Sequence, residues 1–422
     1  VLFEVTHLNK YSWWLEDKRR RETWTETVKR VVDYSISLYQ GPTSEALLKE
    51  EAELMFHKMW CLEAMPAGRT MRIGGTPACY KFPEMNFNCS YTTVKDIRSL
   101  VDSFHMSLCS VGLGYRVLFE DIETIEGFCP TVIVEHEEYN NVPNGAEHTI
   151  CEGIWLGSKL NTYRLTIGDS KEAWIEALET FLINTHVTSF ESDTIKWVIN
   201  YDNIRKEGSR IKTAGGYAAG YEGMKEMFTR LADTITTKKG KLTPVAAMDS
   251  QNIVGKNVVT GGNRRSAQIA LGSPDDEEFI SAKLNLYTKM PDGKWKVPPE
   301  LDHRKMSNNS VFFTSKPSKE KLEAIFENIK NNGEPGFFNL EAARKRRPNC
   351  EGLNPCAEIL LDDKGLCNLS TVIMTSHLHS YYPDDPKLSH KLVFDETKLE
   401  KSVRLATRIG MRQTNVTLSL PE

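Results

Sequence analysis

One short stretch of the chain, Asn354-Pro355-Cys356-Ala357-Glu358, places a thiol between an amide and a carboxylate, and a second thiol, Cys367, follows it. The spacing does not match a zinc site, whose cysteine or histidine ligands come in closely spaced pairs. A thiol beside a carboxylate is a poor thiolate nucleophile, because the negative charge opposes its ionisation. A protonated thiol can instead lose or gain a hydrogen atom, while Glu358 acts as general base on a substrate hydroxyl.

The second thiol adds redox chemistry to this stretch. Two thiols that form a disulfide together supply two electrons, so Cys367 and a partner thiol suit the reduction of a hydroxylated substrate. The same spacing also fits two buried cysteines and a glutamate that caps a helix. The residues alone leave both interpretations open.

The composition is that of a globular protein without a dominant charge. The chain has 422 residues, of which 40% are hydrophobic and 26% are charged, and its net charge is −4. This length allows one large α/β domain or two to three smaller ones. A direct nucleic-acid partner is not expected, since nucleic-acid-binding proteins carry basic surfaces. The sequence contains no run of about 18 apolar residues, so no membrane-spanning helix is predicted. The nine scattered cysteines are typical of a reduced, cytoplasmic protein.

The periodicity of apolar residues predicts where the elements lie. Helices are expected over 11–40 and 44–65, so residues 1–70 are predicted to form an N-terminal helical region. Beyond it, strands are expected at 88–94, 115–120, 131–137, within 193–204 and at 309–315, and helices at 96–111, 170–186, 221–239 and 319–333. This alternation predicts an α/β fold with a mostly parallel sheet over 71–422.

The stretch around Cys356 resembles the finger-loop signature of ribonucleotide reductases, Asn-Pro-Cys-x-Glu followed by Cys-Asn-Leu. Further stretches resemble one branch, the adenosylcobalamin-dependent (class II), monomeric-type ribonucleoside-triphosphate reductases, almost from end to end: WLEDKRRRETWTETVKRVV, GRTMRIGGT, NFNCSYTTV, GLGYRV, GDSKEAW, KTAGGYAAG, NVVTGGNRRSAQIAL, MSNNSVFF and GEPGFFNLEAARKRRPN. The resemblance implies a ten-stranded α/β barrel of two parallel five-stranded halves, with the finger loop through its centre. Because Cys367 lies only 55 residues before Glu422, we expect the second half-barrel to be absent and the chain to be part of a longer protein.

The resemblance also implies roles for the residues of the finger loop. Cys356 matches the cysteine that becomes a thiyl radical and takes the 3′ hydrogen of the substrate. Glu358 matches the base that removes the 3′-hydroxyl proton, and Asn354 matches the amide that binds the ribose hydroxyls. We expect these three residues to alternate along an extended loop tip, so that their side chains share one face.

Two cysteines match the redox pair of the family. Cys89, in NFNCSYTTV, and Cys367 would become a disulfide as the 2′-hydroxyl of the substrate leaves as water. The neighbours of Cys89 are predicted to bind substrate, namely Asn88 and Ser90. The other cysteines are expected to be packing thiols.

Two further regions resemble those that bind the deoxynucleoside triphosphate effector of the family. GGNRRSAQ (261–268) is similar to the loop that carries the specificity signal, with Gly262, Arg264 and Arg265 as binding residues, although an Arg-Arg pair also fits a solvated surface. Residues 120–200 would form an inserted helical segment that builds the effector site. There, Asp169 and Ser170 would open a helix toward phosphate, and an ordinary helix cap explains them equally well.

The resemblance therefore implies a thioredoxin-dependent enzyme that reduces ribonucleoside triphosphates to deoxyribonucleoside triphosphates for DNA synthesis. Its cofactor would be adenosylcobalamin, Mg²⁺ would accompany the bound nucleotides, and no protein metal site is expected. The enzyme would be a cytoplasmic monomer under allosteric control. Two alternatives remain open: a class I-like catalytic subunit that needs a metal-radical partner, and a non-catalytic nucleotide-binding fragment. The pair Tyr381-Tyr382 suggests the class I alternative, but its Pro/Asp-rich surroundings favour an ordinary loop.

Overall fold

The computed structural model describes residues 2–125, 127–156, 159–186, 193–211, 217–236, 241–260, 263–264, 267–381, 387 and 391–419. The chain forms two compact units, of which the first comprises Val1–Asn88 with Cys367–Glu422 and the second comprises Cys89–Leu366. Among the described residues, no helix combines the length and the apolar character that crossing a membrane requires.

The first unit is built mainly from helices. Its apolar core lies among α2 (Trp24–Ser37), α3 (Glu45–Trp60), α4 (Gly68–Ile73) and α14 (Glu396–Gln413). Helix α2 starts with a capping box, in which Thr23 and Glu26 satisfy each other's backbone N–H groups. The other described elements are α1 (Leu2–Thr6), a π-helix (His7–Tyr11), β1 (Trp14–Leu15), β2 (Arg20–Arg21), β3 (Ala64–Pro66), α5 (Pro77–Lys81), two 3-10 helices (Pro83–Asn86 and Met374–His377), β20 (Ser370–Val372), β21 (Leu378–Ser380) and β22 (Leu392–Phe394).

The helix predicted over 11–40 is too long at its start, because a small hairpin of β1 and β2 precedes α2. The cause is the buried carboxylate of Glu22, which accepts a hydrogen bond from the backbone N–H of Trp13 at 3.1 Å. The same carboxylate pairs with the guanidinium of Arg30 at 2.8 Å. These contacts bend the chain back on itself, and helical periodicity does not reveal them.

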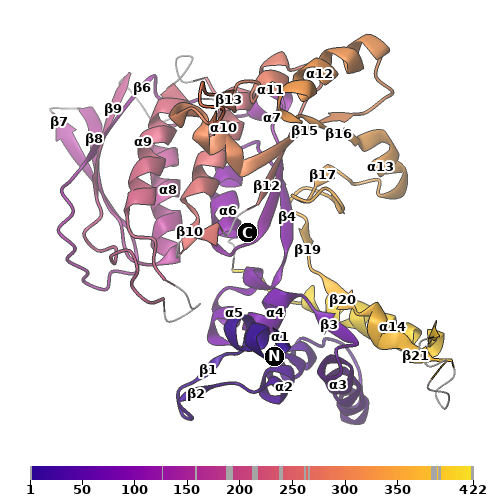
Figure 1. The fold of residues 1–422 in the computed structure, drawn as a ribbon. Coiled ribbons are helices and arrows are strands. Elements are labelled where there is room, and N and C mark those ends of the chain that lie inside the picture. The colour runs from indigo at the N-terminus through magenta and orange to yellow at the C-terminus, as the bar shows by residue number, and fades with distance from the viewer. Residues whose placement is uncertain are drawn as a thin grey trace. The chain divides into compact units, whose positions relative to one another are not determined.

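The second unit contains the main sheet (Figure 1). Five strands are all parallel to their neighbours. They are β4 (Cys89–Thr93), β5 (Gly112–Arg116), β12 (Gln268–Gly272), β15 (Ser307–Phe313) and β16 (Gly336–Asn339). The order across the sheet is β16–β15–β12–β5–β4, and the two-residue β19 (Leu366–Cys367) follows β4. This is the parallel five-stranded half that the fold class predicted.

Helices connect these strands, as parallel pairing requires. Helix α6 (Ile97–Leu108) is capped by Asp96, and α12 (Lys319–Asn332) ends at Gly333 in the left-handed conformation, with φ +81°. Both helices match the sequence prediction. The strand predicted at 115–120 lies earlier in the chain, since β5 begins at Gly112 and stops at Arg116, and Phe119–Ile122 forms α7.

In the sequence, a four-stranded sheet and two helices lie between α7 and the largely buried helix α10 (Pro244–Asn257). The sheet order is β6–β9–β8–β7, with the β8–β7 pair antiparallel and the other pairs parallel. Its bounds are β6 (Thr131–His136), β7 (Ile150–Leu156), β8 (Lys159–Thr166) and β9 (Thr194–Asn200), with helices α8 (Lys171–Thr185) and α9 (Glu222–Thr236). The helical segment expected in this region is therefore a mixed α/β structure, in which Trp197 of β9 is buried against Phe181 of α8 and Tyr163 of β8 stacks on Trp197.

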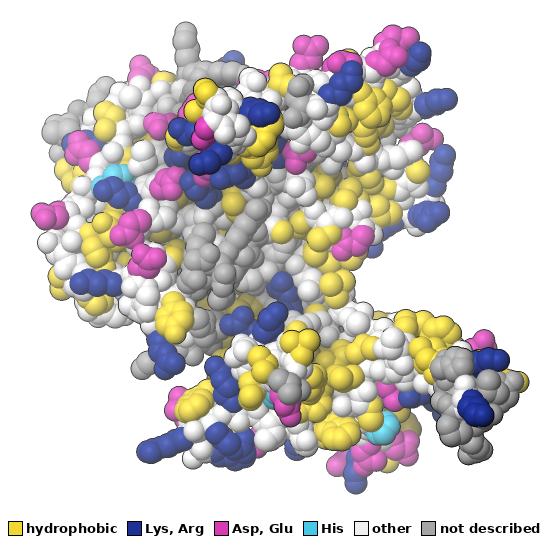
Figure 2. All heavy atoms as spheres, viewed as in Figure 1, with side chains coloured by type: hydrophobic (Ala, Val, Ile, Leu, Met, Phe, Trp, Pro, Cys, Tyr) yellow, Lys and Arg dark blue, Asp and Glu magenta, His cyan; other side chains and the backbone are white. Residues whose placement is uncertain are grey.

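Short elements complete the second unit: β10 (Val259–Thr260), β11 (Asn263–Arg264), α11 (Glu277–Ser281), β13 (Thr288–Lys289), β14 (Trp295–Lys296), α13 (Leu340–Arg346), β17 (Gly352–Leu353) and β18 (Leu360–Leu361). On the face of this unit seen in Figure 2, Lys and Arg side chains lie among Asp and Glu side chains, in keeping with the small net charge of −4.

Candidate active site

The stretch that contains Cys356 is the turn of a short hairpin between β17 and β18. Asn354 closes this turn, because its side-chain carbonyl oxygen accepts hydrogen bonds from the backbone N–H groups of Glu358 at 3.1 Å and Ile359 at 2.9 Å. Ala357 adopts a left-handed conformation with φ +65°, which residues with a side chain adopt rarely. The extended loop tip predicted from the sequence is therefore wrong.

The turn separates its three functional side chains into different environments. Asn354 is fully buried, whereas Cys356 and Glu358 are exposed. The buried amide of Asn354 donates a hydrogen bond to Sγ of Cys89 at 3.4 Å. The structure thus brings together two residues that are far apart in the sequence, while the thiol of Cys356 stays open to a ligand.

The electrostatic surroundings favour the protonated form of the Cys356 thiol. Partial burial of the sulfur, and then the negative charge that Glu358 carries and that Cys89 would carry on ionisation, raise the pKa of Cys356 above that of an ordinary cysteine. A raised thiol pKa disfavours thiolate chemistry at neutral pH. It leaves an S–H group available for hydrogen-atom transfer, as the neighbouring carboxylate suggested from the sequence.

Two glycines let the hairpin lie directly against the main sheet. A Cβ on Gly114 of β5 would lie 1.7 Å from the carbonyl oxygen of Leu353, and one on Gly352 would lie 2.1 Å from the ring of Tyr91. The hydroxyl of Tyr91 also donates to the carbonyl of Glu351 at 3.0 Å. No role at the site was predicted for these residues, although a glycine inside a strand signals a close backbone approach.

An ion-paired arginine holds the start of the hairpin. The guanidinium of Arg116, at the end of β5, contacts the carboxylate of Glu351 at 2.5 Å and that of Asp121 at 2.8 Å. Its side chain is 14% exposed, so solvent screens these pairs less than it screens surface pairs. The position of the hairpin thus depends on β4 and β5 together.

The other predicted redox and substrate residues lie at the ends of strands. Cys367 is buried, and its carbonyl accepts the backbone N–H of Asn88 at 2.8 Å. The side-chain oxygen of Asn88 accepts a hydrogen bond from the backbone N–H of Leu369 at 3.1 Å, so the side chain of Asn88 already binds the backbone after β19. The hydroxyl of Ser90 donates to the carbonyl of Gly112 at 3.2 Å. Cys89 and Cys367 fall in different units, and their pairing stays a prediction.

The predicted effector residues are described only in part. The carboxylate of Asp169 pairs with Arg205 at 2.7 Å, and the hydroxyl of Ser170 caps α8 by accepting the N–H of Ala173 at 2.9 Å. Both side chains therefore have structural contacts already. Arg264 lies in β11, opposite Val259 of β10. Gly262 and Arg265 fall outside the described residues, as does Tyr382.

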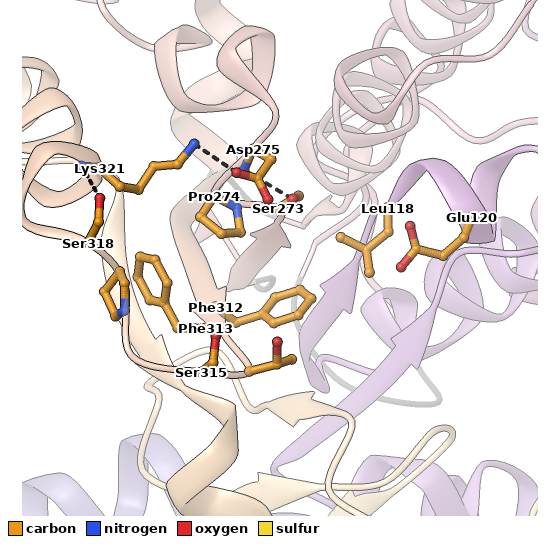
Figure 3. Close-up of a pocket in the computed structure, with 12 residues that line it drawn as sticks. Leu118, Glu120, Ser273, Pro274, Asp275, Phe312, Phe313, Ser315, Ser318 and Lys321 are labelled. Atoms are coloured by element: carbon orange, nitrogen blue, oxygen red, sulfur yellow. Dashed lines mark hydrogen bonds and ion pairs between the residues drawn. The ribbon is translucent and has the colours of Figure 1, made fainter.

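A pocket lies at the carboxyl ends of β5, β12 and β15 (Figure 3). Its volume is about 410 Å³, and Phe312 and Phe313 line it together with Glu120 and several hydroxyl groups. The ammonium of Lys321 at its edge pairs with Asp275 at 2.8 Å. The predicted catalytic residues do not line this pocket.

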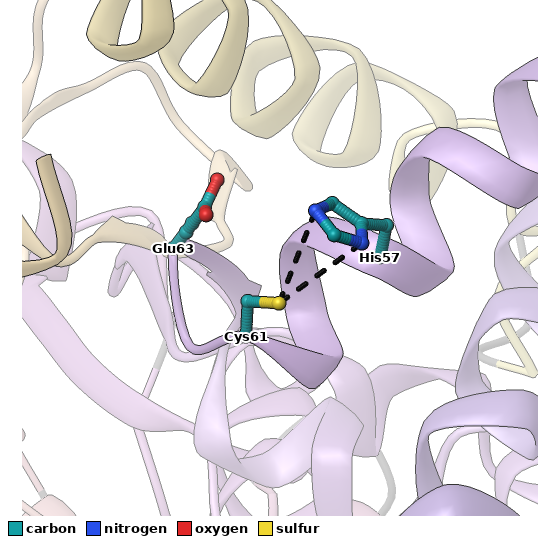
Figure 4. A group of neighbouring side chains, drawn as sticks. All are labelled: His57, Cys61 and Glu63. Atoms are coloured by element: carbon teal, nitrogen blue, oxygen red, sulfur yellow. Dashed lines mark hydrogen bonds between the residues drawn. The ribbon is translucent and has the colours of Figure 1, made fainter. Parts of the chain in front are cut away.

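A histidine, a cysteine and a glutamate come together in the first unit, at the end of α3 (Figure 4). Sγ of Cys61 lies 3.9 Å from Nε2 of His57. The carboxylate of Glu63, however, pairs with the ammonium groups of Lys58 at 2.5 Å and Lys398 at 2.9 Å. Two cations on the same carboxylate oppose the binding of a metal ion, so we assign no metal to this group.

Comparison with known proteins assigns two parts of the chain to families. Residues 1–76 match the ribonucleotide reductase alpha domain, and residues 131–235 match the insertion domain of B12-dependent ribonucleotide reductases. The second match covers the four-stranded sheet with α8 and α9, and it starts and ends further along the chain than the insertion expected at 120–200.

Proteins similar to most of the chain are also known. An adenosylcobalamin-dependent ribonucleoside-triphosphate reductase of Lactobacillus acidophilus is 32% identical over 97% of this chain, and one of Lactobacillus helveticus is 30% identical over 87%. The chain spans 57% and 54% of these two relatives. A crystal structure of a B12-dependent (class II) ribonucleotide reductase superposes with a TM-score of 0.76 at 26% identity, covering 97% of this chain and 59% of the other. The chain is therefore a homologue of the adenosylcobalamin-dependent ribonucleoside-triphosphate reductases and has the class II ribonucleotide reductase fold over the part that it spans.

Proposed function

We propose that this chain supplies the finger loop and the first half-barrel of an enzyme that reduces ribonucleoside triphosphates to deoxyribonucleoside triphosphates. One observation carries the proposal: the exposed thiol of Cys356 has a raised pKa and stands on a turn whose buried amide, Asn354, donates a hydrogen bond to a second thiol, Cys89. The names of the relatives agree with this activity. The enzyme would act in the cytoplasm as a monomer, with a thioredoxin-like protein as reductant.

Cys356 would start the reaction on the substrate. Its exposed S–H group fits a radical initiator that approaches from outside the described chain, and adenosylcobalamin would supply the organic radical that removes this hydrogen atom. The resulting thiyl radical would take the 3′ hydrogen of the ribose. The raised pKa of Cys356 supports this role, because hydrogen-atom transfer needs a thiol and not a thiolate.

The remaining groups would complete the reduction. Glu358 would accept the proton of the 3′-hydroxyl, and the 2′-hydroxyl would leave as water. The thiols of Cys89 and Cys367 would give up two electrons and two protons as they form a disulfide. Support for this pair is that Asn88, the residue before Cys89, donates its N–H to the carbonyl of Cys367. Asn354 would bind the ribose hydroxyls through its side-chain amide, which has a second N–H group besides the one donated to Cys89.

The match to a B12-dependent insertion domain favours this function over the class I-like alternative. The proposed effector site combines Asp169 and Ser170 of this domain, at the start of α8, with Gly262, Arg264 and Arg265 of the specificity loop, which lies outside the domain. A deoxynucleoside triphosphate with Mg²⁺ would bind there. Because Ser170 caps α8, its backbone neighbours are better placed than its hydroxyl to contact phosphate.

The first test of this proposal uses the complete reading frame, purified without oxygen. The protein would be mixed with adenosylcobalamin, a dithiol, a ribonucleoside triphosphate and an effector, then frozen for electron paramagnetic resonance. We expect a thiyl signal coupled to paramagnetic cobalt, absent in Cys356→Ala and kept in Cys151→Ser, which removes another exposed thiol. An intact class II reductase in the same buffers shows that the assay works. If it gives the signal and this protein gives none, the cobalamin assignment fails.

A second test separates radical formation from reduction. In Cys89→Ser and Cys367→Ser the radical signal should persist, whereas formation of deoxyribonucleotide should fall to background, because only the electron donors are lost. The product is measured by chromatography of radiolabelled nucleotide. Normal product formation in either variant would remove that cysteine from the redox pair.

A further inference from the structure

A thiol and an amine meet at the junction of two helices, away from the finger loop. Cys109 follows the last residue of α6, is 1% exposed, and has its Sγ 2.9 Å from Nζ of Lys171, the first residue of α8. That distance is typical of N–H···O hydrogen bonds. Sulfur is larger than oxygen, so the two groups approach each other closely.

The backbone holds both groups in place. Cys109 is the C-cap of α6, and its N–H donates to the carbonyl of His105 at 3.0 Å. Lys171 follows Ser170, whose hydroxyl caps α8 and donates to the carbonyl of Glu147. Helices α6 and α8 share the core of the second unit, where Phe104 and Val101 are buried with Phe181. The thiol and the amine are therefore positioned before any reaction takes place.

We propose that Cys109 and Lys171 form an oxidative modification site, at which dioxygen joins the two side chains through a single oxygen atom. The thiol and the neutral amine react with one dioxygen molecule, so that an S–O and an O–N bond form. The S–H bond, one N–H bond and the O–O bond break, and the second oxygen atom leaves as water. Sulfur and nitrogen give up two electrons each, and dioxygen takes up all four.

The modification is reversible by thiols. Two dithiol molecules supply four electrons and four protons, which return the bridge to a thiol, an amine and water. The bridge would tie the end of α6, next to the main sheet, to the start of α8 in the insertion-domain region. This inference does not depend on the catalytic activity proposed for the protein.

Peptide mass spectrometry tests the bridge directly. The full chain is purified with a dithiol under nitrogen, freed of the dithiol, and kept either under nitrogen or in air-saturated buffer before digestion with a glutamate-specific protease. After air exposure we expect the peptides that contain Cys109 and Lys171 to be joined. The mass of the joined peptide should exceed the summed masses of the two separate peptides by about 14 Da, because one oxygen atom is added and two hydrogen atoms are lost. The joined peptide should be absent under nitrogen and should disappear after dithiol treatment.

Two variants and one control define the site. Lys171→Arg keeps the positive charge but removes the amine, and Cys109→Ser removes the sulfur, so both should lack the joined peptide. Cys129→Ser changes another buried thiol of the same unit and should keep it. Lys171→Arg leaves the buried core unchanged, so its result stands even if Cys109→Ser folds poorly.

Three outcomes would overturn the proposal. The first is an unjoined Cys109 peptide in the air-exposed wild type, whether the thiol is unchanged or has gained about 16 Da as a sulfenic acid. The second is a joined pair without the extra oxygen, and the third is a joined peptide that persists in Lys171→Arg. As support, amide hydrogen exchange at residues 106–111 and 171–175 should slow reversibly on air exposure in the wild type and stay unchanged in Lys171→Arg.

Discussion

The carbonyl oxygen of Leu353 occupies the space that a side chain on Gly114 would need. An ideal Cβ at Gly114 would lie only 1.7 Å from that oxygen. Gly114 is also in the interior of the sheet, paired with Tyr91 of β4 and Ile269 of β12. The carbonyl of Leu353 and the Cα of Gly114 both belong to the backbone, so neither can shift without moving the chain around it.

We therefore predict that Gly114→Ala displaces the hairpin that carries Cys356. Overpacking of a tight interior costs about 1–3 kcal/mol, and a clash with backbone places this substitution at the upper end. Urea unfolding would show the loss of stability, and reductase assays of the complete protein should show near-complete loss of activity. Gly410→Ala, in helix α14, is the matched control, because its Cβ would meet only side-chain atoms, at 3.2 Å and beyond. Equal effects of the two variants would contradict the packing argument.

Removal of the Asn354 side chain should open the turn. Asn354→Ala leaves the N–H groups of Glu358 and Ile359 without their acceptor, and each unsatisfied buried group costs about 1–3 kcal/mol. We expect a lower free energy of unfolding, measured in urea, together with loss of activity. Asn354→Asp keeps an acceptor for both N–H groups and should recover most of the stability. If Asn354→Asp is as unstable as Asn354→Ala, the turn hydrogen bonds are not the cause.

The charge of Glu358 should control the reactivity of Cys356. Burial raises the pKa of this thiol first and Glu358 raises it further, so Glu358→Gln lowers the pKa without restoring an ordinary value. The thiolate fraction at pH 8 then rises, and alkylation by iodoacetamide at Cys356, followed by peptide mass spectrometry, should become severalfold faster. Glu152→Gln is the matched control, because Glu152 raises the pKa of the exposed Cys151 in the same way. It should accelerate alkylation at Cys151 only.

A buried ion pair beside α10 should give stability a defined pH dependence. Burial opposes ionisation of Asp249, but hydrogen bonds from His303 and Arg304 outweigh it and lower the pKa of the carboxyl below 3.8. A lowered pKa in the folded state stabilises the fold above the pKa of the unfolded chain, and this contribution is lost only as the pH falls through the folded pKa. Asp249→Asn leaves the largely buried guanidinium of Arg304 without its carboxylate partner, so we expect the free energy of unfolding to fall by about 3–5 kcal/mol.

Urea unfolding of both proteins at several pH values checks this prediction. The difference between Asp249→Asn and the wild type should stay constant from pH 7 to pH 5, and it should shrink below the ordinary carboxyl pKa of 3.8. A difference that already shrinks between pH 7 and pH 5 would show that the carboxyl titrates near neutrality and is not held ionised by its partners.

Local patterns were sufficient to predict several elements of the fold. Strand β4 follows from the β-rich stretch that contains Cys89, and the end of α12 follows from Gly333, since left-handed residues at helix ends are usually glycines. The hairpin before α2 was missed because its cause is the buried carboxylate of Glu22. Strand order and the second sheet also depend on contacts between distant residues, which a single sequence does not display.

The candidate site shows the same division. Residue types and spacing drew attention to Asn354, Cys356 and Glu358, whereas their roles came from the resemblance to a known family. The raised pKa of Cys356 agrees with the chemistry inferred from its neighbour. The shape of the turn could not be predicted, because nothing in the sequence marks Ala357 as left-handed. The contact with Gly114 was also hidden, since it joins residues more than 200 positions apart.

The main sheet has a consequence for how the protein is made. Its five parallel strands lie side by side in the order in which they are synthesised, β4 first and β16 last. On the ribosome, each emerging strand can therefore add to the edge left by the one before it. The hairpin with Cys356 follows all five strands in the sequence and packs on the two that are synthesised first, β4 and β5. The thiol proposed to carry the radical thus reaches its place only after the surface that restrains it has been built.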